Sequence, residues 1–189
     1  MAEFSNAPLR ELKDQPFQLL REMERRSRQN LASGPAEQTD TAEWVGIGCL
    51  LGDERFLIQR DQVREVMMMP PMVTRVPGSR TWVAGLANLR GQLLPIVDLR
   101  MFLGAGTSQG IRTARVLVAE HGDNLAGIIV DEVFGFRRFS QSEFSTTVPE
   151  TQLRCERYLE GACLRGADVW PVLSIRKLME AQEFQQAAA

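Results

Sequence analysis

The residues of this chain best suited to nucleophilic or metal chemistry are three cysteines and one histidine. Cys155 lies among arginines, and nearby positive charge can lower the pKa of a thiol and favour the reactive thiolate. Cys49 and Cys163 fall in strand-like segments and are expected to be buried. His121 precedes a Gly-Asp turn without a nucleophile beside it, so we expect an exposed turn histidine. A small β-barrel enzyme that uses the Cys155 thiol remains an alternative, although an inert, exposed loop thiol explains this residue more simply.

The sequence offers no set of residues typical of other catalytic or cofactor-binding sites. A single histidine and the lack of a Cys-x-x-Cys pair argue against a zinc site. No phosphate-binding G-x-x-x-x-G-K-[ST] motif occurs, and no strand-linked G-x-G-x-x-G motif. Asp98, Asp131 and Glu132 fall at turns or helix starts, where capping accounts for a carboxylate. We therefore expect no catalytic residue, no metal site and no cofactor.

Charge and hydropathy disfavour two further classes of protein. The 189 residues contain 22 Lys+Arg and 24 Asp+Glu, for a formal net charge of −2. This balance provides no long-range field to hold nucleic acid, so a nucleic-acid-binding barrel is disfavoured. No run approaches the roughly 18 apolar residues of a membrane-spanning helix, and the N-terminus lacks a secretory signal pattern. We expect a cytoplasmic protein with no nucleic-acid partner and no direct membrane insertion.

Arg90 and Gly91 are the most informative pair for a binding function. Glycine in a tight turn between two strands supplies the positive φ that such a turn requires. Arg90 would project from the lip of this hairpin, where a guanidinium can form bidentate bonds to a partner's carboxylate. A surface arginine paired within its own chain is an equally good explanation. Four methionines before the hairpin offer either an adaptable contact surface or half-buried loop packing. They are Met67, Met68, Met69 and Met72.

Short strands and a few helices are expected to position these residues. Residues 1–43 form an extension with an amphipathic helix over about 16–31, followed by a flexible polar linker. From Trp44 onward, period-2 alternation and tight turns predict strands. In the first half of the domain these strands cover about 44–51, 55–59, 82–89 and 93–97. The expected helical segments are 61–66, with Asp61 as its cap, 99–103 and 174–186.

Part of the sequence repeats. The segment 52–63 aligns without a gap on 122–133, and Gly, Asp, Ile, Asp and Val match at the same five places. The segment 89–100 resembles 164–176 once one residue is inserted. Two matched windows in the same order indicate that one strand-rich unit occurs twice.

The two copies would cover about 44–104 and 112–180 and together form the domain 44–180, with a tail over 181–189. Each copy is near the lower size limit for an independent core. Short strands joined by tight turns favour small closed barrels, because closure removes exposed strand edges. Two barrels packed side by side would leave a groove between them.

The hairpin segment 88–100 resembles the signature hairpin of the CheW-like family of chemotaxis coupling proteins. The resemblance extends to 63–66, 74–78 and 127–133, and covers about 44–180. It implies a mainly β fold of two SH3-like five-stranded β-barrels with short helices, in agreement with the repeat. Three further segments are similar to coupling proteins of type IV pilus (twitching motility) chemosensory systems. They are 16–20, 81–88 and 129–135.

The resemblance implies a non-enzymatic adaptor that links methyl-accepting receptors to a CheA-type histidine kinase. Its partners would be the cytoplasmic tip of the receptor and the regulatory domain of the kinase. The adaptor would be cytoplasmic and recruited to the inner face of the membrane through receptor arrays. By motif match, Asn88, Arg90 and Gly91 would lie at the coupling hairpin, and Val63 and Val66 would line an apolar groove that faces the receptor. A flagellar-type chemotaxis pathway remains the alternative to a pilus pathway.

Overall fold

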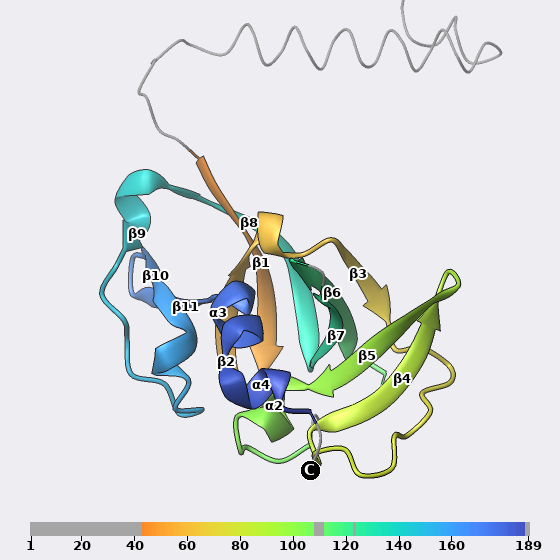
Figure 1. Ribbon diagram of the computed structural model, residues 1–189. Helices are drawn as coiled ribbons and strands as arrows, with labels where there is room; N and C mark the ends of the chain where they lie inside the picture. Colours follow the sequence, from red (N-terminus) through yellow and green to blue (C-terminus); the bar gives the residue numbers. More distant parts are fainter. Residues whose placement is uncertain (1–42, 108–111, 123, 188–189) are drawn as a thin grey trace, which may run out of the picture. The chain divides into compact units, whose positions relative to one another are not determined.

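The computed structural model describes residues 43–107, 112–122 and 124–187. The helix expected over 16–31 and the linker after it lie outside the described residues. The first strand, β1, begins at Glu43, one residue before the expected boundary. The described part is mainly β, as the sequence predicts, and consists of two sheets with a few short helices (Figure 1).

Six strands form the first sheet, in the order β8-β1-β2-β11-β10-β9. Neighbours are antiparallel except β2 and β11, which run parallel with Leu57 opposite Val172. The strands are β1 (Glu43–Leu51), β2 (Glu54–Gln59), β8 (Glu132–Ser140), β9 (Phe144–Ser145), β10 (Leu159–Arg165) and β11 (Asp168–Leu173).

Five strands form the second sheet, in the order β3-β6-β7-β5-β4. Its one parallel pair is β5 and β7, with Ile96 opposite Gly127. The strands are β3 (Glu65–Met68), β4 (Val83–Leu89), β5 (Gln92–Asp98), β6 (Arg115–His121) and β7 (Asn124–Val130).

The repeat is visible in the strand pairing, but the two copies do not form separate barrels. Strands β1 and β2 of the first copy pair with β8 and β11 of the second, so segments far apart in the sequence lie side by side (Figure 1). In exchange, β6 and β7 of the second copy pair with β3 and β5 of the first. The parallel pairs are equivalent under the repeat. The expectation of one barrel per copy was wrong because local alternation specifies strands without specifying their long-range partners.

The expectation of closed barrels also needs correction, since the end strands of each sheet are not hydrogen-bonded to one another. The free edge of β4 is partly covered, because Thr74 and Leu86 form an antiparallel bridge through two 2.8 Å backbone hydrogen bonds. This bridge leaves no room for a side chain at Gly85, where an added Cβ would lie 2.3 Å from the Thr74 carbonyl oxygen. Each sheet is therefore SH3-like but open: its two end strands are not hydrogen-bonded to each other, and we call the gap between them the open seam.

The helical segments confirm one cap and correct two predictions. Helix α2 (Leu99–Phe102) begins after Asp98, whose side chain accepts a 3.2 Å hydrogen bond from the Met101 amide. The helical turn expected over 61–66 is a 3-10 turn over Arg60–Gln62 without a side-chain cap, followed by β3.

The expected C-terminal helix is two helices, α3 (Ile175–Glu180) and α4 (Gln182–Gln185). They are separated at Ala181, whose ψ of 132° is extended. Aromatic contacts account for the change of direction, since Phe184 stacks on Trp82 and packs edge-on against Phe102.

The largest core cluster joins the two sheets. It combines Cys49 and Phe56 of the first sheet with Leu117 and Ile128 of the second, and Leu178 of α3 closes it. Shared burial of this kind makes the two sheets one cooperative unit, because removing either exposes the apolar face of the other.

Candidate functional site

The hairpin between β4 and β5 carries the predicted site residues Asn88, Arg90 and Gly91. Both turn residues have positive φ, 51° for Arg90 and 88° for Gly91, as a type I′ turn requires. The Asn88 Oδ1 accepts a 2.7 Å hydrogen bond from the Gly91 amide and so fixes the turn. Asparagine and glycine suit this geometry, but arginine does not, since a left-handed conformation costs a residue with a Cβ about 1–2 kcal/mol.

Arg90 is both exposed and paired within its own chain. Its side chain is 77% exposed, and its Nη2 donates a 2.7 Å hydrogen bond to Glu65 Oε2 on β3. Because β3 and β4 are the two ends of the second sheet, this ion pair spans the open seam. The sequence did not point to Glu65 as a site residue, although it lies in the segment 63–66 that resembles the family. Its partner is 25 residues away, and sequence spacing gave no sign of that contact.

Exposed apolar side chains flank this ion pair in sequence. Val66 and Met68 alternate with inward residues along β3 and are 41% and 72% exposed. Leu93, opposite Asn88 in the β4–β5 pairing, is 69% exposed. Val66 and Met68 lie on the face of β3 opposite Glu65, because successive side chains of a strand point to opposite faces. Large exposed apolar side chains are typical of protein-interaction surfaces.

Val63 is the other residue predicted to line the apolar groove. It is 6% exposed and belongs to the core cluster shared by the two sheets. Val63 precedes β3, so the alternation that exposes Val66 does not extend to it. Where the sheets meet, the described residues line a small pocket of about 230 Å³ that contains Arg100 and Asp131.

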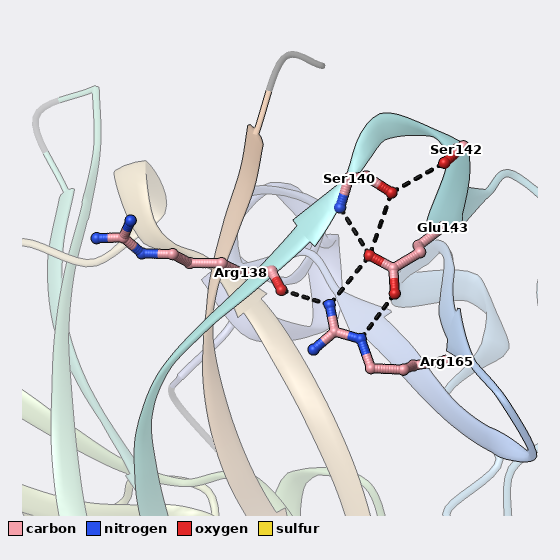
Figure 2. A network of polar contacts seen from close by, with 5 residues as sticks. All are labelled: Arg138, Ser140, Ser142, Glu143 and Arg165. Atoms are coloured by element: carbon pink, nitrogen blue, oxygen red, sulfur yellow. Dashed lines mark hydrogen bonds and ion pairs between the residues drawn. The ribbon is translucent and has the colours of Figure 1, made fainter. Parts of the chain in front are cut away.

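The second Arg-Gly hairpin, between β10 and β11, also carries an arginine that pairs with a glutamate of its own chain, here through more hydrogen bonds than at Arg90 (Figure 2). Arg165 donates to both carboxylate oxygens of Glu143, at 2.7 and 3.0 Å, and to the carbonyl of Arg138 on β8, at 2.6 Å. The hydrogen bond from Arg165, with that from the Ser140 amide, lowers the pKa of Glu143 to about 2. The same carboxylate raises the pKa of Arg165. This pair therefore stays charged throughout the neutral pH range and links β10–β11 to β8.

The three cysteines are buried and free of disulfide bonds. Burial raises the pKa of Cys49 to about 12 and that of Cys163 to about 11, as expected for small core residues. Cys155 is also buried rather than in an exposed loop, and desolvation raises the pKa of its thiol despite the nearby arginines. Burial and a raised pKa both disfavour a reactive thiolate at Cys155.

The remaining candidates for chemistry are engaged in structural contacts. His121 ends β6, with Nε2 3.0 Å from Glu180 Oε1 on α3. Within the described ranges, no group of three or more His, Cys, Asp and Glu residues is placed to hold a metal ion. In the same part of the chain, no helix is long and apolar enough to cross a membrane.

Known proteins share this fold and much of this sequence. Residues 46–183 match the family model of the CheW-like domain. The chain is 41% identical over 173 residues to Protein PilI of Pseudomonas aeruginosa, covering 92% of this chain and 96% of that protein. It is 34% identical over 125 residues to Chemotaxis protein CheW of Helicobacter pylori, covering 66% and 74% of the two chains.

Among solved structures, the scaffolding protein TtCheW from Thermoanaerobacter tengcongensis has the same fold. The TM-score is 0.65 at 22% identity, over 74% of this chain and 94% of that one. The resemblance found at the 88–100 hairpin is thereby confirmed over most of the chain. The chain belongs to the CheW-like domain family of chemotaxis coupling proteins.

Proposed function

We propose that this protein is a non-enzymatic adaptor that couples methyl-accepting receptors to a CheA-type histidine kinase. The observation that carries the proposal is the β4–β5 hairpin, which holds an exposed arginine in a left-handed conformation and carries the exposed apolar side chain of Leu93. A left-handed conformation is uncommon for a residue with a Cβ, and such residues cluster at functional sites. Family membership supplies the class of partner, and the 41% identity to PilI favours the type IV pilus pathway over a flagellar one.

The proposed coupling surface consists of Val66, Asn88, Arg90 and Gly91. One partner would be the cytoplasmic tip of a receptor and the other the regulatory domain of the kinase. The protein would act in the cytoplasm and be recruited to the inner face of the membrane through receptor arrays. Val63 supports this surface from the core rather than touching a partner.

Arg90→Glu is expected to weaken binding to the receptor signalling domain or the kinase regulatory domain by about 30-fold or more, as for an interface hot spot. Folding stability should change by no more than about 1 kcal/mol, because Arg90 is largely exposed and surface ion pairs contribute little. Isothermal titration with each partner domain and a thermal melt measure the two effects. Arg137→Glu, a reversal at another exposed arginine, is the matched control and should leave both affinities within about twofold.

The double variant Arg90→Glu/Glu65→Arg distinguishes direct contact of Arg90 with a partner from positioning of β3 through the ion pair with Glu65. It restores an ion pair across the seam while leaving the wrong charge at the hairpin tip. Affinity is expected to stay low in this variant. Recovery of affinity would show that Arg90 acts only by holding β3, and unchanged affinity in Arg90→Glu would remove it from the surface altogether.

A further inference from the structure

A second pocket lies at the end of β4 remote from the Arg90 hairpin. It has a volume of about 540 Å³, and two arginines, Arg75 and Arg80, line it. Val83, at the start of β4, forms part of its wall. Six residues of extended strand separate Val83 from the turn, roughly 20 Å. The pocket is therefore distinct from the proposed coupling surface.

Neither guanidinium in this pocket has an ion pair or hydrogen bond to any described residue. Most other described arginines have such a partner. Examples are Arg64 with Glu120, Arg138 with Glu43, Arg157 with Glu183 and Arg165 with Glu143. The acidic residue that lines the pocket, Asp98, is 8% exposed and caps helix α2, so its carboxylate is already engaged.

The backbone that carries the two arginines is held in place. The Val83 amide donates to the Arg80 carbonyl at 3.0 Å, and the Arg80 amide donates to the Ala187 carbonyl at 2.9 Å. The Ser79 hydroxyl donates a 2.8 Å hydrogen bond to the Val76 carbonyl. A fixed backbone reduces the ordering cost of binding, because only the arginine side chains remain to be ordered.

We propose that this pocket is a binding site for an acidic segment of a partner protein, with glutamate or aspartate carboxylates bound by Arg75 and Arg80. Guanidinium groups bind carboxylates through paired, charge-assisted hydrogen bonds. The walls between them are partly apolar, from Val76, Val83 and Met101. Such walls suit the aliphatic stems and apolar neighbours of acidic side chains better than a hydrated free ion.

Overall charge does not account for such binding. The chain carries a net charge of −2, which provides no long-range attraction for an acidic segment. Binding of an acidic segment therefore requires a local arrangement, and the two arginines that line this one pocket provide it. This site would give the proposed adaptor a further contact with a partner. The assignment does not depend on the adaptor role, because the pocket and the coupling surface consist of different residues.

The test uses the full chain and a fluorescein-labelled peptide of alternating glutamate and leucine, with a glutamine-for-glutamate peptide as the neutral match. Fluorescence anisotropy gives the affinities. R75Q/R80Q is expected to weaken binding of the acidic peptide at least tenfold, given the strength of hydrogen bonds between charged groups. The control R60Q/R137Q removes two exposed arginines outside the pocket and should change the affinity less than twofold.

Three results would overturn the assignment. Equal losses in R75Q/R80Q and R60Q/R137Q would reduce the effect to general charge. Equal affinity for the neutral peptide would show that carboxylates are not recognised. Displacement of the peptide by about 1 mM inorganic phosphate would make the pocket a site for a small anion instead. Arg90→Glu should leave peptide binding unchanged, so this test and that of the coupling surface fail separately.

Discussion

Replacing Asp131 with alanine is expected to lower the free energy of unfolding by about 3–5 kcal/mol, the usual effect of removing one partner of a buried ion pair. Its side chain is 6% exposed and lies 3.5 Å from Arg100 Nη1, whose own side chain is 13% exposed. The Asp131 Oδ2 also accepts a 2.7 Å hydrogen bond from the Gly52 amide. One carboxylate thus ties the β1–β2 turn of the first sheet to α2, which follows β5 of the second.

The large loss of unfolding free energy in Asp131→Ala comes from the Arg100 guanidinium, which would remain buried without its carboxylate partner. Arg100 Nε is buried without a hydrogen-bond partner among the described residues, and Nη2 donates a 3.1 Å hydrogen bond to the Ala105 carbonyl. After the loss of Asp131 this neutral carbonyl would remain near the buried charge, but the carboxylate that balances it would be gone. Urea unfolding measures the change, with Asp53→Ala, at an exposed turn position, as the control expected to stay within about 0.5 kcal/mol. The double variant Arg100→Leu/Asp131→Leu should lose less than Asp131→Ala. A loss below about 1 kcal/mol in Asp131→Ala would contradict this account of how the sheets are joined.

Gly161→Ala is the second substitution with a large expected effect, about 4 kcal/mol from steric overlap and backbone strain together. An added Cβ would lie 2.1 Å from the carbonyl oxygen of Ser145, and the φ of Gly161 is +151°. The obstacle is backbone, so no side-chain rotation relieves it. Gly85 in the other copy meets the Thr74 carbonyl in the same way, which makes the close approach a feature of the repeat.

Gly166→Ala is the matched control, because Gly166 lies in the same hairpin, has a φ of +62° and has no atom within 4 Å of an added Cβ. It should cost only about 1–2 kcal/mol, the strain of the left-handed conformation. Thermal and urea unfolding of both variants give the comparison. Similar losses in Gly161→Ala and Gly166→Ala would show that strand β9 moves aside easily and that the contact is unimportant.

Much of the fold could be predicted because its determinants are local. Alternation in 44–51 and the Arg90-Gly91 turn are properties of a few consecutive residues, and the structure has β1 and the β4–β5 hairpin where they were expected. The capping role of Asp98 was equally local. The exchange of strands between copies was not predictable, since β2 could pair with either copy's last hairpin on alternation alone.

The site was less predictable, because exposure and pairing depend on contacts distant in sequence. Val63 and Val66 are both valines in one short motif, yet one is in the core and the other on the surface. The partner of Arg90 could not be identified from spacing, and neither could that of Arg165, Glu143, 22 residues away. Cys155 looked like a loop thiol because its burial depends on packing that its neighbours in sequence do not reveal.

The central claim, that this protein joins a receptor to a kinase, is tested most directly by a bridging experiment. The signalling domain of a methyl-accepting receptor is immobilised and the regulatory domain of a CheA-type kinase is added with and without this protein. We expect the kinase domain to be retained only when this protein is present, in an amount that saturates at a fixed ratio to it and falls with Arg90→Glu. Failure to retain the kinase domain while each domain is folded, or equal retention without this protein, would contradict the adaptor role.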